Sequence, residues 1–258
     1  TEVNNTREQA TAVEPGQTIN GRVNGATDVD FYKFAGTAGQ RLLFDCQAQR
    51  IDSKLDAILE LQDANGRRLA SARGTTQRDA ILDVTLPAAG DYFLRVTDFI
   101  YAGGEDLFYR LSLRTAPYVD VIVPPAGVAG STATYTIYGR NLPNGQPTDL
   151  MLNGRPLQQQ TVEITLPADG TSWPTGLRVE PFGTGSDAFP FTLMSPQGPA
   201  NTVSLGFAAS PVVMETEPNN LPPQAQKIIA PGEYAGAFQA KGDVDLYQFE
   251  AKAGEVLW

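Results

Sequence analysis

Two short stretches of the sequence concentrate side chains that carry oxygen. The chain opens TEVNN, and after Met214 it continues ETEPNN, so carboxylates precede a pair of adjacent asparagines in both places. The tripeptide Asp-Val-Asp then occurs at 28–30 and again at 243–245. Carboxylate and amide oxygens are the ligands that Ca²⁺ prefers, and it takes about six to eight of them. The two stretches therefore predict cation sites.

Most conventional catalytic chemistry is missing from the sequence. With no histidine and one cysteine, Ser-His-Asp and Cys-His arrangements and histidine zinc sites are excluded. The sequence has no S-x-x-K, no G-x-S-x-G and no glycine-rich phosphate loop before a helix. Cys46 lies between apolar residues in RLLFDCQAQ, which is typical of a buried, unreactive thiol. We therefore expect a chain that is not an enzyme; carboxylate chemistry of the glycosidase kind is the remaining alternative.

The charge balance argues against two classes of partner. The chain has 29 acidic and 19 basic residues, a net charge of −10. Nucleic acids and anionic membrane surfaces require clustered Lys and Arg, and no such cluster occurs. No apolar run approaches the roughly 20 residues that a spanning helix needs, so we expect no membrane insertion. The chain begins at Thr1 without Met, which a removed signal peptide or a trimmed chain would explain.

The chain resembles itself at a distance of 215 residues. When residues 2–43 are laid on 217–258 without gaps, 14 of the 42 positions are identical, and more than half of these are Asp, Asn, Gly or aromatic. Tyr32, for example, falls on Tyr247. We interpret the last residues as the opening part of a second copy of the first domain.

The first 116 residues have the pattern of short strands joined by turns. DFYKFAG and QRLLFDCQAQ are separated by the turn-like GTAG, and AILELQDANGRRLASA predicts a hairpin around Asp63–Gly66. AILDVTL, DYFLRVTDF and LFYRLSLR follow. Seven or eight strands without a long amphipathic helix predict an antiparallel β-sandwich.

The middle of the chain predicts a second sandwich. Its strand candidates are VDVIVPP, STATYTIYG, DLMLNGRPL, QTVEITLP, GLRVEPF, FPFTLMS and NTVSLGF, a number that fits an immunoglobulin-like sandwich without the disulfide. The predicted fold class is therefore all-β, with two consecutive antiparallel β-sandwich domains and an incomplete third. We place the jelly-roll-like domain at 1–116, the immunoglobulin-like domain at 117–213 and the incomplete domain at 214–258.

Residues 1–115 resemble the bacterial pre-peptidase C-terminal domain. The resemblance rests on E-x-N-N at 2–5, D-V-D with the aromatic run at 28–34, DANGRRLA at 63–70, and AGDYFLRV at 89–96. E-x-E-x-N-N at 215–220 extends it to the second copy. This family of β-sandwiches is found beside secreted proteases and in large envelope proteins, and is related to the collagen-binding domain of clostridial collagenases. The middle domain resembles transcription-factor-type immunoglobulin-like modules in YTIYGRNLPNGQPTDLMLNG (135–154).

The resemblance implies calcium ligands at the start of each pre-peptidase domain. In calcium-binding relatives the acidic N-terminal segment and an aspartate at the next strand supply oxygen. The matching residues here form the first oxygen set, Glu2, Asn4, Asn5, Asp28 and Asp30, and the second oxygen set, Glu215, Glu217, Asn219, Asn220, Asp243 and Asp245. Residues i and i+2 of a strand share a face, so Asp28 and Asp30 are expected to converge. The second set has one more carboxylate and is expected to bind more tightly. Asparagine turns and a solvated strand start are the alternative.

Aromatic residues raise a second possibility. Phe99 and Tyr101 lie in a predicted loop beside two glycines, and Trp173 lies in GTSWPTG. Exposed aromatic rings on a sandwich can stack on sugars or press on a polymer. Packing at a junction between domains is the favoured alternative.

These observations predict a non-catalytic module of a larger secreted or cell-envelope bacterial protein. Its expected role is adhesion, spacing or targeting, with calcium stiffening the linkers that lead into the domains. The alternative is a module that binds an extracellular polymer, either polysaccharide or fibrous protein, and serves a secreted hydrolase or protease. Apart from such a polymer, the expected partners are neighbouring domains of the same chain.

Overall fold

The computed structural model describes residues 3–74, 79–152, 154–168, 188–238 and 241–255. Their regular structure is strand with short 3-10 turns, which confirms the all-β prediction. The chain divides into two compact units, Thr1–Pro117 with Ser195–Gly198, and Tyr118–Met194 with Pro199–Trp258. No helix among the described residues is long and apolar enough to cross a membrane.

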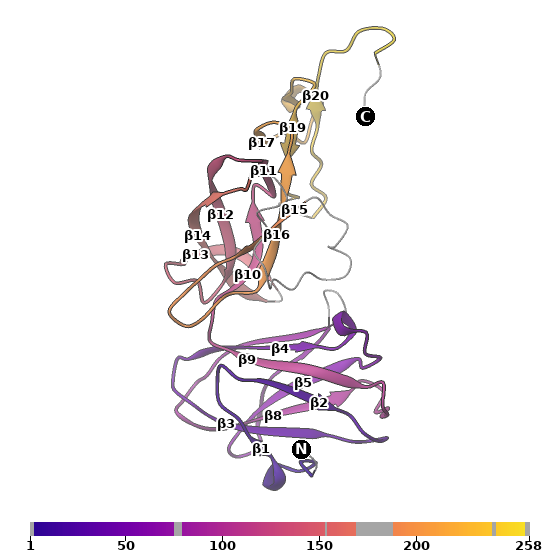
Figure 1. The fold of residues 1–258 in the computed structure, drawn as a ribbon, viewed down its shortest axis with the longest axis vertical. Helices are drawn as coiled ribbons and strands as arrows, with labels where there is room; N and C mark the ends of the chain where they lie inside the picture. The colour runs from indigo at the N-terminus through magenta and orange to yellow at the C-terminus, as the bar shows by residue number, and fades with distance from the viewer. Residues whose placement is uncertain (1–2, 75–78, 153, 169–187, 239–240, 256–258) are drawn as a thin grey trace. The chain divides into compact units, whose positions relative to one another are not determined.

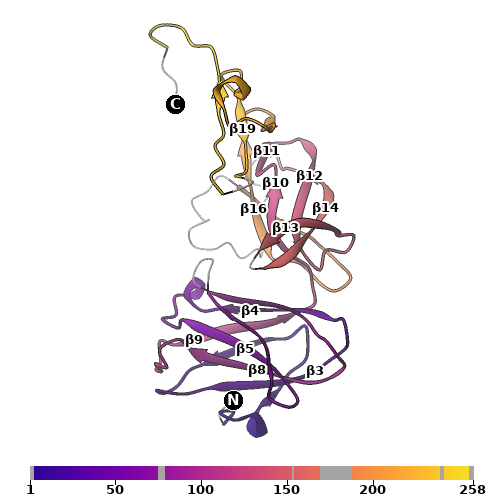
Figure 2. The ribbon, with the colours of Figure 1, turned by 180° about the vertical axis from the view of Figure 1, so that it is seen from behind.

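The first unit is a sandwich of two sheets with strand orders β1-β3-β8-β5-β6 and β2-β9-β4-β7 (Figure 1). The strands are β1 (Thr11–Ala12), β2 (Thr18–Arg22), β3 (Asp30–Gly36), β4 (Arg41–Gln47), β5 (Ala57–Asp63), β6 (Arg68–Arg73), β7 (Ala80–Thr85), β8 (Gly90–Asp98) and β9 (Phe108–Arg114). The 3-10 turns are η1 (Arg7–Gln9), which lies against β3 (Figure 2), and η2 (Gln49–Ile51). The described residues of this unit contain nine strands, where seven or eight were predicted, and no strand candidate in the sequence corresponded to β1 or β2.

Alternating side chains of the two sheets form the core of the first unit. Phe34 of β3 lies 5.6 Å from Phe44 of β4 and 5.7 Å from Tyr92 of β8, measured between ring centroids. Burying such rings is the main favourable term in the folding of a small sandwich. Cys46 is fully buried in the same core, as predicted, and burial, followed by the charges of Asp79 and Asp45, raises the pKa of its thiol.

The hairpin between β5 and β6 forms where the sequence predicts it. The Asp63 carboxylate accepts backbone hydrogen bonds from Asn65 and Arg67, each at 2.9 Å. Gly66 has φ of +82°, a conformation that glycine adopts without steric cost. The turn is therefore specified locally, by an Asx-type contact and one glycine.

The first part of the second unit is also a two-sheet sandwich. Among its described residues, one sheet has the order β10-β12-β14-β13 and the other β11-β16-β15. The strands are β10 (Tyr118–Val123), β11 (Ala126–Val128), β12 (Thr132–Arg140), β13 (Gln146–Leu152), β14 (Arg155–Thr165), β15 (Ala188–Thr192) and β16 (Thr202–Ala208). Tyr135, Ile137 and Leu205 lie at the centre of its core.

The structure corrects the strand assignment in this region. DLMLNGRPL is not one strand: β13 ends at Leu152 and β14 starts at Arg155, so the two pair as a hairpin. Gly154, with φ of +73°, lies in the turn, and β14 continues through QTVEIT. β11 was not predicted, and GLRVEPF lies outside the described residues.

The last part of the second unit repeats the pairing of the first unit. Its elements are β17 (Val212–Met214), η5 (Pro222–Gln224), β18 (Gln226–Lys227), β19 (Glu233–Ala235) and β20 (Tyr247–Gln248). β18 pairs with β20 so that Gln226 lies opposite Tyr247. In the first unit β1 pairs with β3 so that Thr11 lies opposite Tyr32, and both of these residues are 215 positions earlier than their counterparts. Both pairings are parallel, as are β11 with β16 and β17 with β19, so the predicted antiparallel arrangement does not hold at these short strands.

Candidate cation site

Three carboxylates converge at the start of the last segment. Glu215, Glu217 and Asp245 each offer one oxygen, and these oxygens all lie within 4.8 Å of one another. The three residues are half-buried, and they belong to the second oxygen set. Such a spacing places several oxygen donors around one point, which is the arrangement that a hard divalent cation requires.

Backbone pairing positions the two glutamates. β17 pairs with β19, and the backbone N–H of Glu215, one residue beyond β17, donates to the Ala235 carbonyl at 2.8 Å. The Glu215 Oε1 accepts a hydrogen bond from the backbone N–H of Ala237. Glu217 Oε2 accepts one from the Asn219 N–H at 2.8 Å. Each glutamate thus has a second carboxylate oxygen that takes no part in these hydrogen bonds.

The side chain of Asn219, in the same segment, is buried without a hydrogen-bond partner. Asn219 has no exposed surface, and neither its Oδ1 nor its Nδ2 has a hydrogen-bond partner. The Glu215 Oε2 and the Asp245 Oδ1 are also buried without a partner. A buried polar atom that lacks a hydrogen bond costs free energy, so four such atoms in one segment indicate a site that an additional group completes.

The remaining members of the second oxygen set have local roles. Asn220 Oδ1 accepts a hydrogen bond from the Val244 N–H at 2.9 Å, and Asp243 Oδ1 accepts one from the same N–H at 3.1 Å. Asp243 is not part of the group of three carboxylates. The structure therefore brings together half of the six predicted ligands and uses two others in a turn.

The electrostatics of the group favour a positive ligand. Burial, followed by the charge of Glu215, raises the pKa of Asp245 above its ordinary value. The same two causes raise the pKa of the Tyr247 phenol. Neighbouring carboxylates repel one another when both are ionised, and a cation between them removes that cost.

A glycine provides the space for the Glu215 carboxylate. A Cβ built on Gly236 would overlap Glu215 Oε2 and would lie 3.0 Å from the Tyr247 hydroxyl. The counterpart of Gly236 in the first unit is Gly21, where a Cβ would overlap the end of Tyr109. The Glu215 carboxylate and the Tyr109 phenol therefore fill the space beside two glycines that are 215 residues apart in the sequence.

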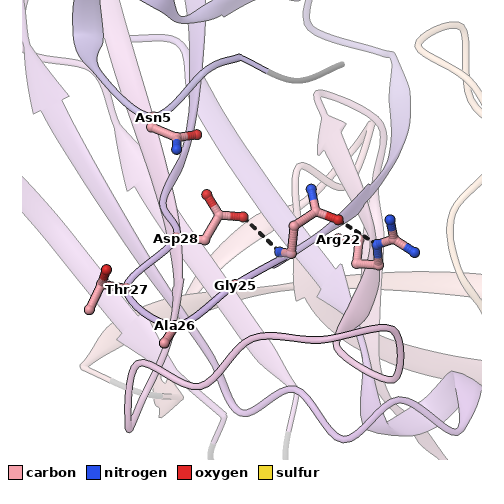
Figure 3. A pocket seen from close by; sticks show the side chains of 7 residues that line it. Asn5, Arg22, Gly25, Ala26, Thr27 and Asp28 are labelled. Atoms are coloured by element: carbon pink, nitrogen blue, oxygen red, sulfur yellow. Dashed lines mark hydrogen bonds between the residues drawn. The ribbon is translucent and has the colours of Figure 1, made fainter.

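The first oxygen set is divided between two places. Asn4 and Asp30 are buried and adjacent, since the Phe31 N–H donates to the Asn4 carbonyl at 2.9 Å. The Asn4 Oδ1 has no partner, and Asp30 accepts a hydrogen bond from the Tyr109 hydroxyl. Asn5 and Asp28 instead line a polar pocket with Arg22 and the 24–27 loop (Figure 3). Glu2 lies outside the described residues.

The predicted aromatic loop is exposed at the surface of the first unit. Phe99 and Tyr101 are 43% and 50% exposed, and Ile100 between them is 76% exposed. The Arg73 guanidinium lies 3.3 Å from the centroid of the Phe99 ring. Trp173 lies outside the described residues.

Comparisons with known proteins agree with the first sandwich. The model of the bacterial pre-peptidase C-terminal domain matches residues 28–98. A probable subtilase-type serine protease of Deinococcus radiodurans is 41% identical over 71 residues, which are 27% of this chain and 10% of that protein. The chain thus matches only a small part of that relative.

Two solved structures show weaker likeness. The pre-peptidase C-terminal domain of a collagenase from Bacillus anthracis is 19% identical, covers 43% of this chain and 99% of its own, and gives a TM-score of 0.35. PliG, a periplasmic inhibitor of g-type lysozyme from Aeromonas hydrophila, is 18% identical, covers 40% of this chain and 96% of its own, and gives a TM-score of 0.31. The family model matches residues within the first sandwich, so this part of the chain is similar to the bacterial pre-peptidase C-terminal domain.

Proposed function

We propose that this chain is a non-catalytic accessory region of a larger secreted or envelope-associated bacterial protein, and that a protease is the catalytic part it serves. The family of the first sandwich and the protease relative support this proposal. We further propose that residues 214–258 begin a second domain of the same family. The shared register of β1 with β3 and of β18 with β20 supports it.

Calcium is the cation that best suits the second oxygen set. The observation that carries this proposal is the convergence of Glu215, Glu217 and Asp245 within 4.8 Å beside the unpartnered Asn219 amide. All the available donors are oxygens, and Ca²⁺ accepts carboxylate, amide and carbonyl oxygen in flexible geometry. Asn219 Oδ1 would be a fourth ligand.

The bound ion would stiffen the linker that leads into the segment. Glu215 follows β17, and Asp245 precedes β20, so one ion held by both joins the incoming chain to a strand of the segment. β17 adds only three residues to β19, which is a weak pairing alone. The ion and the pairing together would fix the direction in which the chain enters the module, which suits a spacer between domains.

Thermal unfolding with added CaCl₂ tests the proposal. An affinity typical of extracellular modules, about 10⁻⁴ M, would stabilise the native state by about 2.7 kcal/mol at 10 mM calcium. Asp245→Asn should abolish most of that gain. Glu163→Gln is the matched control, because Glu163 is an exposed carboxylate on β14 of the same unit and lies outside the group of three.

Two results would contradict the calcium proposal. One is a melting temperature that does not change between EDTA and 10 mM calcium. The other is a calcium effect that Asp245→Asn and Glu163→Gln leave equally large, because such an effect would arise elsewhere in the chain.

A second candidate function is attachment to an extracellular polymer. Three consecutive exposed apolar residues, Phe99, Ile100 and Tyr101, favour it, because contiguous apolar surface on a soluble domain often marks an interaction site. Sedimentation with insoluble polysaccharide and with insoluble fibrous protein tests it, and Phe99→Ala with Tyr101→Ala should release the chain. Phe238→Ala, which removes a more exposed ring in the second unit, is the control.

A further inference from the structure

A polar pocket lies between the start of the chain and the loop that joins β2 to β3. Its volume is about 500 Å³, within the range of small-molecule sites. Its lining is Asn5, Arg22, Asn24, Gly25, Ala26, Thr27 and Asp28, with no aromatic or large aliphatic side chain. Figure 3 shows the side chains of Asn5 and Asp28 near each other at this pocket. A ligand of this pocket must therefore be polar.

The side chains of the pocket offer both donors and acceptors with balanced charge. Arg22 donates from Nε to Asn24 Oδ1 at 2.6 Å, which orients its guanidinium (Figure 3). The Asp28 carboxylate accepts from the backbone N–H groups of Asn24 and Val29, at 2.7 and 2.9 Å. Asn5 and Thr27 are exposed and add an amide and a hydroxyl. One cation and one anion cancel, so the chemistry fits a neutral ligand that carries many hydroxyl or amide groups.

Thr27 occupies a backbone conformation that favours glycine. Its φ is +67°, and a β-branched residue at positive φ is strained. The counterpart 215 residues later is Gly242, which has φ of +87°. The second copy thus has the residue that the backbone prefers, whereas the first copy has a strained residue whose side chain lines the pocket. Strain of this kind is concentrated at functional sites.

A second strained residue adjoins the first. Tyr101 has φ of +57°, and its carbonyl accepts the Thr27 N–H at 3.0 Å. Asp98 holds this loop, since its Oδ2 accepts the N–H groups of Ile100 and Ala102, each at 3.0 Å. The two loops therefore meet in fixed geometry, and the exposed Tyr101 ring belongs to the loop beside the pocket. A polar pocket beside an exposed aromatic ring offers hydrogen bonds and an apolar face to one ligand.

We infer that this pocket, with Tyr101 beside it, is a subsite for a neutral sugar residue of a polysaccharide. Its hydroxyl and amide groups would bond Asn5, Arg22, Thr27 and Asp28, and a following residue would contact the Tyr101 ring. The inference rests on the second proposed function, polymer attachment, and names its ligand and its contact residues. It is independent of the cation group, which lies in the other unit.

NMR titration of the full chain with two tetrasaccharides tests the inference. The probes are chitotetraose and cellotetraose, and the expected result is that at least one shifts the amide signals of Asn5, Thr27, Asp28 and Tyr101 with a dissociation constant in the millimolar range or below. Thr27→Gly and Tyr101→Ala should each weaken that binding about tenfold. Thr27→Gly should keep the melting temperature at or above that of the original chain, because it relieves the strain. Asp245→Asn and Phe238→Ala should leave binding unchanged.

Three results would overturn the inference. The first is no shift at 10 mM of either tetrasaccharide. The second is binding that Thr27→Gly and Tyr101→Ala both leave intact. The third is binding of a Gly-Pro hexapeptide with a free carboxylate in place of the sugars, which would make the pocket a peptide site. Tyr101→Ala could release the chain from an insoluble polymer while Thr27→Gly does not. That result would support polymer attachment as a function and would contradict a sugar subsite in the pocket.

Discussion

The carboxylate of Glu215 fills the space beside Gly236 that a Cβ would otherwise take. A methyl group on Gly236 would overlap Glu215 Oε2. The same carboxylate belongs to the group formed with Glu217 and Asp245. The position of the proposed calcium ligand therefore depends on the absence of a side chain at Gly236, the residue after Ala235, whose carbonyl accepts the Glu215 N–H.

Gly236→Ala should weaken calcium binding without removing a ligand. The added methyl group displaces Glu215 from the group, and displacing a ligand from its support costs about tenfold in affinity or more. Isothermal titration with CaCl₂ measures the change. Gly25→Ala is the control, because its Cβ would meet no atom within 4 Å. Equal affinities in the two variants would show that Glu215 is not a ligand.

Without calcium, the stability contributed by Asp245 should fall as the pH rises. Its folded-state pKa is raised by burial and by Glu215, so the folded chain holds this proton to higher pH than the unfolded chain. The contribution is full below the ordinary pKa of about 4 and is lost as the pH passes through the raised value. In EDTA at pH 7, Asp245→Asn should therefore have a higher melting temperature than the original chain, and this difference in melting temperature should shrink toward pH 4. A gap that widens toward pH 4 would contradict the raised pKa.

Cys46 should report on the opening of the first unit. Its thiol is fully buried and its pKa is raised, so a thiol reagent such as Ellman's reagent should react only as fast as the unit unfolds. Urea below the unfolding transition should accelerate labelling in proportion to the unfolded population. Stoichiometric labelling within seconds in native buffer would show that the core is open at this position.

Tyr109→Phe should destabilise the first unit by about 1–3 kcal/mol. The Tyr109 hydroxyl donates to the buried Asp30 carboxylate and lies 2.6 Å from the Tyr32 hydroxyl. Removing it leaves buried polar atoms with one partner fewer. Urea unfolding measures the loss, and Tyr138→Phe on β12 of the other unit provides the comparison. A loss no larger than that of the control would show that water replaces the hydroxyl.

Features that depend on neighbours in the sequence could be predicted. The Asp63–Gly66 turn followed from an Asx contact and a glycine, both local. The 215-residue shift predicted matching segments, and the strand register of the described residues follows the same shift. The alternation of apolar and polar residues, with a period of two, predicted the strands of the sandwiches. The hairpin in DLMLNGRPL was missed because the apolar pattern on both sides of Asn153–Gly154 suits one strand as well as two.

The membership of the cation group could only be predicted in part. The sequence supplied six oxygen donors, but Asn220 and Asp243 bond the Val244 N–H, a local alternative that Asn and Asp side chains always have. The strain at Thr27 was also hidden, since no pattern of residue types encodes a positive φ at a threonine. The contrast with Gly242 in the shifted alignment was the signal that could have revealed it.

Hydrogen exchange of the segment 210–217 with and without calcium tests the central claim most directly. The Glu215 N–H donates to the Ala235 carbonyl, so its exchange rate reports how firmly the incoming chain is held. Saturating calcium should slow exchange at Glu215 at least tenfold in the original chain and in Glu163→Gln, and should lose most of that effect in Asp245→Asn. Exchange that calcium leaves unchanged in the original chain would contradict the claim that an ion fastens the linker to the module.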